Sequence, residues 1–175
     1  MQDFEKILAD GDLRSTGNSN LIATKVKNKS DFDQLFQCLY HSNRLVVMRA
    51  ADAIEKITIK DPEFLHDHKK ELLHLFEKAT NKELKWHLGI LIPRLALTNH
   101  EFKNVWDGLV GWAKDKNNSR LVRVSAVQGL YELTKKKGDL MNNFNELSRE
   151  VEKENIPSVN ARIRNIRKEI EHSSK

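Results

Sequence analysis

Histidines are the side chains of this sequence with the widest choice of chemistry, and three of the seven lie close together. His66, His68 and His74, with Asp67 between the first two, have the groups that bind transition metals. On a helix, however, side chains two positions apart point in different directions, and no cysteine or further carboxylate lies close enough to complete the coordination. We therefore expect no metal site and no cofactor.

A second candidate is the pair Trp86 and His87, because an aromatic ring beside a titratable group can form a binding or catalytic pocket near neutral pH. At a period of 38 residues, however, Trp86 matches Met48 and Val124, which favours packing between repeats. The single cysteine, Cys38, lies in an apolar stretch with no histidine beside it to activate it. Because the sequence also lacks a glycine-rich phosphate loop and a nucleophile elbow, we expect no catalytic residues and a protein that is not an enzyme.

The elements that position these residues are predicted to be repeated helices. Residues 46–57 show apolar or small residues with the i, i+3, i+4, i+7 spacing of a buried helix face, and the pattern returns after 38 residues at 84–95 and again at 122–133. An amphipathic helix precedes each of these segments, so each repeat is expected to be a helical hairpin. Small residues on the second helices favour a close approach of the neighbouring helix. These small residues are Ala51, Ala53, Gly89 and Gly129.

Such hairpins are expected to stack into a single all-α domain over 1–175, a right-handed α-α superhelix whose second helices line a concave face. Two helix starts are marked in the sequence. Asp61 places a capping oxygen before Pro62, and residues 98–101 have the spacing of a capping box. The expected divisions are an N-terminal cap over 1–29, hairpins over 30–58, 62–96 and 99–135, and a C-terminal cap over 139–171.

The segment VMRAADAIEKIT at 47–58 resembles the second helix of a HEAT repeat, and a period of 38 residues suits that class. Together with DLRSTG at 12–17, WHL at 86–88 and PRLALT at 93–98, it makes most of the chain similar to a bacterial family of HEAT-repeat proteins of unassigned function. The resemblance implies an armadillo-like α-solenoid and a role as a binding scaffold, and it implies no chemistry.

The candidate binding surface is the side of the second helices opposite their apolar face. Arg49, Asp52 and Lys56 share this side because they are spaced i, i+3, i+7, and the other repeats contribute the matching positions. A polar helix face that is only solvated is an equally supported interpretation. On the binding interpretation the partner is a protein or peptide, and the candidate residues are Arg49, Asp52, Lys56, His87, Arg94 and Gln128.

The alternative partner is a nucleic acid. The chain has a net charge of +5, and residues 102–137 contain eight basic and three acidic residues. A basic surface can contact phosphates, and one group of HEAT-like solenoids repairs alkylated DNA by holding the duplex in a basic concave face. Lysine-rich connectors that are only solvated are the simpler explanation of this stretch. The possible phosphate contacts are Arg120, Arg123, Arg164 and Arg167.

The composition is that of a soluble globular domain, with 39% hydrophobic and 31% charged residues. No apolar run is long enough to span a membrane, and the first residues lack the pattern of a secretory signal. We therefore expect a cytoplasmic monomer without membrane contact.

Overall fold

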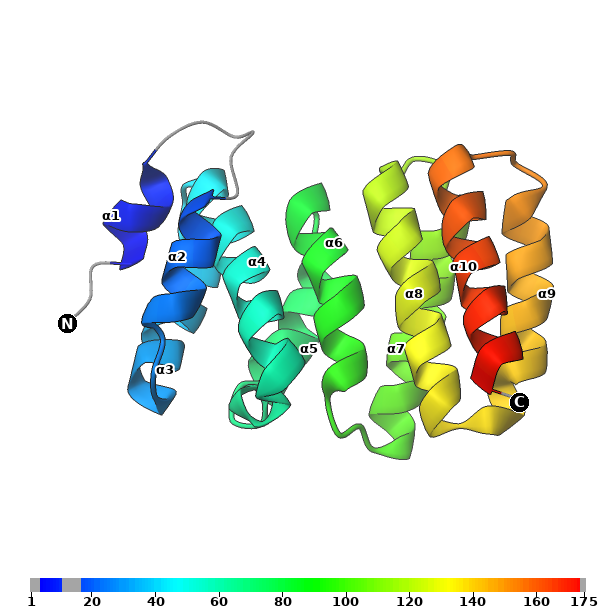
Figure 1. Cartoon of the computed structure of the whole chain (residues 1–175), viewed down its shortest axis with the longest axis horizontal. Helices are drawn as coiled ribbons and strands as arrows, with labels where there is room; N and C mark the ends of the chain where they lie inside the picture. The colour runs from blue at the N-terminus through cyan, green and yellow to red at the C-terminus, as the bar shows by residue number, and fades with distance from the viewer. Residues whose placement is uncertain (1–3, 11–16, 174–175) are drawn as a thin grey trace. The chain divides into compact units, whose positions relative to one another are not determined.

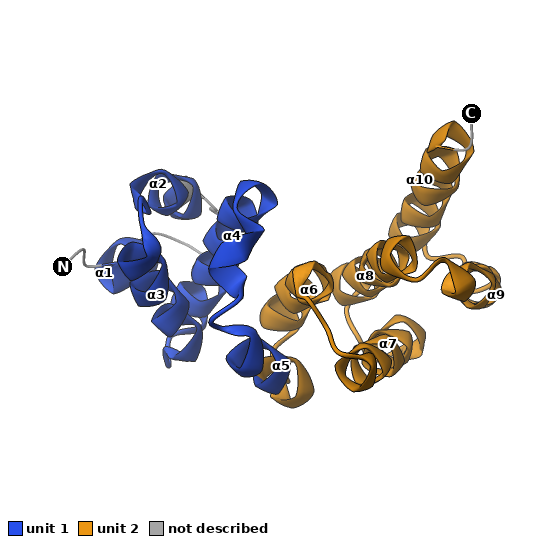
Figure 2. Cartoon of the chain, turned by 90° about the horizontal axis from the view of Figure 1, so that it is seen from below, with its two compact units in different colours: residues 1–74 blue, residues 75–175 orange. Residues whose placement is uncertain are grey.

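The computed structural model describes residues 4–10 and 17–173, and every regular element in these ranges is helical (Figure 1). The expected all-α class is therefore confirmed. Within the same ranges, no helix is both long and apolar enough to cross a membrane. The chain divides into two compact units, Met1–His74 and Leu75–Lys175 (Figure 2). The single domain and the right-handed superhelix both remain predictions.

In unit 1 the long helix α4 is the common packing partner, because it contacts α1, α2, α3 and both short 3-10 helices. Helix α5 (Lys69–Lys78) crosses the boundary between the two units. The other elements of unit 1 are α1 (Phe4–Ala9), α2 (Gly17–Lys25), α3 (Lys29–Gln37), η1 (Cys38–Tyr40), α4 (Arg44–Lys60) and η2 (Pro62–Leu65).

In unit 2 the corresponding central helix is α8, which contacts α6, α7, α9 and α10. Helices α6, α8 and α10 follow one another in one row (Figures 1 and 2). The elements of unit 2 after α5 are α6 (Lys82–Leu91), η3 (Ile92–Arg94), α7 (Asn99–Lys114), α8 (Arg120–Lys136), η4 (Gly138–Leu140), α9 (Met141–Glu152) and α10 (Pro157–Ser173).

The predicted period of 38 residues is visible in the helix starts. The residues immediately before α4, α6 and α8 are Asn43, Asn81 and Ser119, which are spaced by 38 residues. The side chain of each accepts a hydrogen bond from a backbone N–H in the first turn of its helix. Such N-caps satisfy donors that the helix itself leaves without acceptors. Each repeat therefore carries its own signal for the start of its second helix.

Of the two helix starts predicted from the sequence, one is confirmed and one is wrong. Thr98 forms a capping box with Glu101 at the start of α7. Asp61 makes no side-chain cap, and Pro62 begins the 3-10 helix η2 instead of an α-helix. The next α-helix, α5, begins only at Lys69.

Small residues bring the helices of unit 2 close together, as predicted. A Cβ atom added to Gly89 of α6 would lie 2.7 Å from Oγ of Ser125 on α8. A Cβ atom added to Gly129 of α8 would clash with the carbonyl oxygen of Gly89 and would lie 3.1 Å from Leu109 of α7. A side chain at Gly129 would therefore require a shift of the backbone, and one at Gly89 would require the Ser125 side chain to move.

Candidate functional site

Arg49, the first residue of the expected binding face, is buried, with 1% of its surface exposed. Its Nη1 donates hydrogen bonds to the backbone carbonyls of Leu8, at 2.8 Å, and of Asp10. These carbonyls lie at the end of α1, where the last C=O groups of a helix have no N–H donor within the helix. The predicted surface position is therefore wrong for Arg49, whose guanidinium holds α1 against α4.

Asp52 and Lys56 join α4 to α2. The carboxylate of Asp52 accepts hydrogen bonds from the hydroxyl of Ser19 and from Nζ of Lys56. The same Nζ also donates to Oδ1 of Asn20, at 2.6 Å. Lys56 is partly exposed and Asp52 much less so, with 35% and 15% of the side chains accessible. This part of the predicted face is therefore a contact between two helices with one accessible cation.

In unit 2, His87 is also buried, with 1% of its surface exposed. Its ring stacks on Trp86, with the ring centroids 4.6 Å apart. The predicted surface position is therefore wrong for His87. Gln128 and Arg94 are half-buried, and the amide nitrogen of Gln128 donates to Glu132 of the same helix at 2.7 Å.

The two errors have one physical cause, which is the width of the buried helix face. Arg49 lies three positions after Val46 and four before Ala53, both fully buried. His87 likewise lies three positions after Leu84, which is 7% exposed. Residues at these spacings share a helix face, so the polar residues are buried together with their apolar neighbours. The polar character of Arg49 and His87 does not by itself reveal on which side of the helix they lie.

Arg123, one of the four expected phosphate contacts, is only 2% exposed. Its Nε donates to the backbone carbonyl of Ala113 at 2.8 Å, and its Nη1 donates to the carboxylate of Glu154 at 2.9 Å. The hydrogen bond from Arg123 lowers the pKa of Glu154 below its ordinary value of 4.5. Arg123 therefore holds α7, α8 and the turn after α9 together, and the prediction that it contacts phosphate is wrong.

Arg167 is paired as well, because its two terminal nitrogens donate to the two carboxylate oxygens of Glu152 at 2.9 and 2.5 Å. Arg120 and Arg164 are exposed. The four arginines therefore do not form one accessible basic surface, since one is buried and another is held by a carboxylate.

Lysines of the basic stretch also have partners within unit 2. Lys114 pairs with Glu150 at 2.6 Å, and Lys135 pairs with Glu169 at 2.9 Å. Lys136 donates to a backbone carbonyl, and burial lowers its pKa. Much of the positive charge that made residues 102–137 resemble a phosphate-binding region is compensated by groups distant in sequence.

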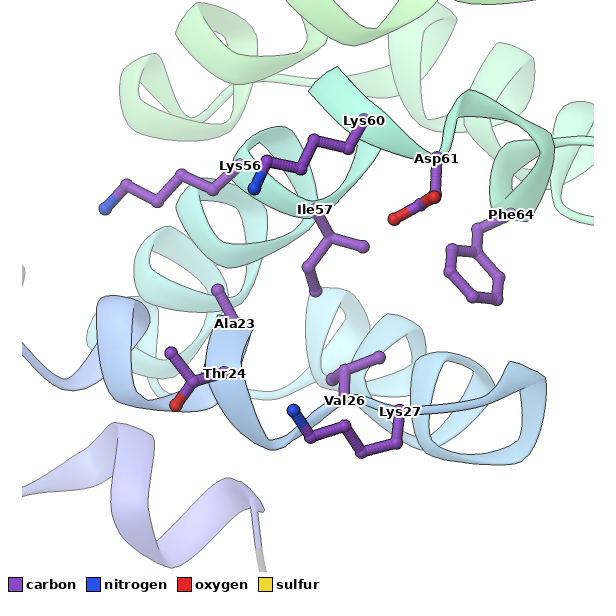
Figure 3. A pocket seen from close by; sticks show the side chains of 9 residues that line it. All are labelled: Ala23, Thr24, Val26, Lys27, Lys56, Ile57, Lys60, Asp61 and Phe64. Atoms are coloured by element: carbon purple, nitrogen blue, oxygen red, sulfur yellow. The ribbon is translucent and has the colours of Figure 1, made fainter.

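A pocket of about 440 Å³ opens in unit 1 beside the ends of α2 and α4 (Figure 3). Its walls come from the last turn of α2, the connection between α2 and α3, the last turn of α4, and η2. The lining residues are Ala23, Thr24, Val26, Lys27, Lys56, Ile57, Lys60, Asp61 and Phe64.

The apolar part of this pocket is already in place in the folded chain. Ile57 and Val26 point toward each other from opposite walls, and the ring of Phe64 closes a third side (Figure 3). The Phe64 ring stacks on Phe32, with centroids 4.9 Å apart and the planes 13° from parallel. Phe32 is fully buried, so the position of Phe64 is fixed by the core of unit 1.

The polar part of the pocket consists of lysines and one carboxylate. Lys27 and Lys60 are exposed, and neither side chain forms an ion pair or hydrogen bond with another described residue. The carboxylate of Asp61 is likewise without such a partner within the described ranges and points toward the pocket (Figure 3). Because the ammonium of Lys56 is held by Asp52, two available cations face one available anion. This arrangement suits binding of an acidic group beside an apolar one.

Of these residues, only Lys56 was among the predicted site residues. Lys27, Lys60 and Asp61 were not predicted, because the predicted residues were chosen from helix faces, whereas these three lie at or just after helix ends. A signal was nevertheless present in the sequence, since lysines cluster where α2 stops and where Pro62 interrupts the chain after α4.

Among the residues that the structure describes, no group of three or more His, Cys, Asp or Glu side chains has an arrangement that could hold a metal ion. His68 instead lies between two carboxylates. Its Nε2 is 2.7 Å from Asp33 and its Nδ1 is 2.9 Å from Glu71, while its ring stacks on Phe36. Cys38 is buried, and its thiol donates to the backbone carbonyl of Gln34 at 3.6 Å.

Comparison with known proteins identifies a family over most of the chain. A family model described as a HEAT repeat domain matches residues 12–170. No curated protein and no solved structure matches the chain.

Proposed function

Because the chain belongs to the HEAT repeat domain family, we propose that it is a non-enzymatic scaffold that binds a protein partner. HEAT repeats generally act as scaffolds for interactions between proteins. The family match covers residues 12–170 and therefore includes all of α2 to α9 and most of α10.

The pocket of unit 1 is the single observation that carries this proposal. Its aromatic wall, Phe64, is already fixed by stacking on the core, so binding a partner costs little conformational entropy for this side chain. Two of its lysines, Lys27 and Lys60, are exposed and have no partner among the described residues, whereas the lysines of unit 2 described above have partners. Preformed apolar surface beside available charge is what a recognition site requires.

The test is affinity capture from cells of the source organism, followed by reconstitution with the purified partner in isothermal titration calorimetry. The expected result is one protein that is enriched over a tag-only control and that forms a saturable complex with the purified chain. Failure to retain any protein, or retention without saturable binding in solution, would contradict the proposal.

The same preparation separates protein binding from nucleic-acid binding. Labelled duplex and single-stranded DNA and RNA are titrated with the chain across a salt series, with fluorescence anisotropy as the readout. Because Arg123 and Arg167 are held internally, we expect no tight binding. Tight binding that weakens steeply with salt would favour the nucleic-acid alternative.

A further inference from the structure

The pocket of unit 1 combines an apolar centre with charges that come from separate elements. Lys60 belongs to the last turn of α4 and Lys27 to the connection after α2, and the two lie on opposite sides of the apolar centre (Figure 3). We propose that this pocket binds a segment of the partner polypeptide in which an aspartate or glutamate lies next to an aliphatic residue. This inference rests on the protein-binding role proposed above.

The apolar centre defines the aliphatic half of the occupant. Val26 and Phe64 are only half-buried, and Ile57 faces Val26 from the opposite wall. A pocket of about 440 Å³ is large enough for a branched aliphatic side chain and the backbone on either side of it. Covering these three side chains would remove apolar surface from water, which favours association.

The lysines define the acidic half. A carboxylate beside the apolar centre would meet the ammonium group of Lys27 or of Lys60, and neither group is paired with a described carboxylate. Lys56 does not offer a third, because its ammonium is already bonded to Asp52 and Asn20. Charge complementarity is therefore concentrated at two positions on either side of the apolar centre.

Asp61 favours a polypeptide over a simple polyanion as the occupant of the pocket. Its carboxylate points toward the pocket, where it would repel the phosphates of a nucleic acid. A polypeptide segment instead carries backbone N–H groups, from which the Asp61 carboxylate can accept hydrogen bonds. Donors on the lysines and an acceptor on Asp61 thus match the mixed donors and acceptors of an extended peptide.

The experiment is selection from a displayed library of random peptides on the immobilised, full-length chain. We expect the selected sequences to be enriched in aspartate or glutamate directly beside leucine, isoleucine or valine. Each selected peptide is then synthesised, and its affinity is measured by fluorescence anisotropy. Selected peptides without this pairing of residues would overturn the proposal.

The decisive variant reverses both pocket charges, as Lys27→Glu with Lys60→Glu. Because two favourable charge contacts become repulsive, affinity for the selected peptides should fall at least about tenfold. The matched control is Lys70→Glu with Lys78→Glu, which changes the net charge equally at two exposed lysines outside the pocket. The control should bind like the unmodified chain, and equal losses in both double variants would reject the pocket as the site.

A conservative variant tests the apolar half without altering charge. Val26→Thr has nearly the same shape as valine but places a hydroxyl at the apolar centre, and affinity should fall by about threefold. Circular dichroism should show the same helical signal in all three variants, because these side chains are not in the core. Unchanged affinity in Val26→Thr and in the pocket charge variant together would contradict the site.

Failure here is distinguishable from failure of the proposed function. Methyl chemical shifts of Ile57 and Val26 report occupation of the pocket directly. If selected peptides or a captured protein bind while these shifts stay constant, the scaffold role stands and the pocket assignment is wrong. If no peptide is selected and no protein is captured, the proposed function itself is wrong.

Discussion

The two units treat their charged residues differently. Unit 2 contains the most basic stretch of the sequence, yet Arg123, Arg167 and several lysines there are bonded to carboxylates or backbone carbonyls of the same unit. Unit 1 has the pocket in which Lys27 and Lys60 have no such partner among the described residues. The difference shows that local charge density is a poor guide to a binding surface when distant acidic residues fold back onto it.

The buried arginines show what the two units share. Arg49 in α4 and Arg123 in α8 both lie in second helices of hairpins, and both donate to backbone carbonyls of a preceding helix or its end. They are not at matching positions of the repeat, because Arg123 matches Val47 and Arg49 matches Ser125 at the 38-residue period. The same device for joining helices therefore occurs at two different places in the repeat.

The largest expected effect tests whether unit 2 depends on close helix packing. Gly129→Ala places a methyl group against the Gly89 carbonyl oxygen, so we expect it to destabilise the fold by about 3 kcal/mol. The measurement is urea unfolding followed by circular dichroism. Gly111→Ala is the control, because nothing lies within 4 Å of its added Cβ atom and alanine favours a helix by up to about 1 kcal/mol. If Gly129→Ala lowers the free energy of unfolding by no more than an ordinary surface substitution does, α6 and α8 are not closely packed.

A middle-sized effect should be equal in the two units, because both use the same helix start. Asn43→Ala in unit 1 and Ser119→Ala in unit 2 each remove an N-cap, and each should cost about 1 kcal/mol. Thermal unfolding measures both against the unmodified chain. If only one of the two variants is destabilised, the N-caps at equivalent repeat positions do not contribute equally to stability.

The smallest effect concerns the carboxylate that compensates Arg123. The hydrogen bond from Arg123 lowers the pKa of Glu154 in the folded chain below 4.5, so the pair stabilises the fold above that pH and loses its contribution as the pH falls through the lowered value. Relative to Glu154→Gln, the unmodified chain should therefore be more stable near neutral pH, and the difference should disappear on acidification. Melting temperatures of both chains at a series of pH values measure this. A difference that is the same at acidic and neutral pH would show that the pair is not formed in solution.

Several features of the fold could be predicted from the sequence because they depend on neighbours along one helix. The capping box of Thr98 and Glu101 follows from two residues three positions apart, and it is present. The close approach at Gly89 and Gly129 follows from small residues that recur on a buried helix face. The cap at Asp61 was predicted by the same local logic and is wrong, because the chain forms a 3-10 helix there.

The candidate site was much less predictable, because its residues come from different elements. Lys27 and Lys60 are 33 positions apart, and no pattern along either helix links them. Arg49 was expected at the surface because its spacing with Asp52 and Lys56 placed it opposite the apolar face, but its environment is set by Leu8 and Asp10, about 40 residues earlier. Long-range partners of this kind decide whether a charge is available.

The sequence by itself determined the all-α class and the 38-residue spacing of the starts of α4, α6 and α8, because helix periodicity and capping act over a few residues. Only the tertiary structure decided which polar groups are exposed. Burial and hydrogen bonding depend on the surfaces that other helices bring to a residue, and these surfaces come from segments far apart in the chain. For this protein, that difference separates the buried Arg49 and Arg123 from the accessible Lys27 and Lys60.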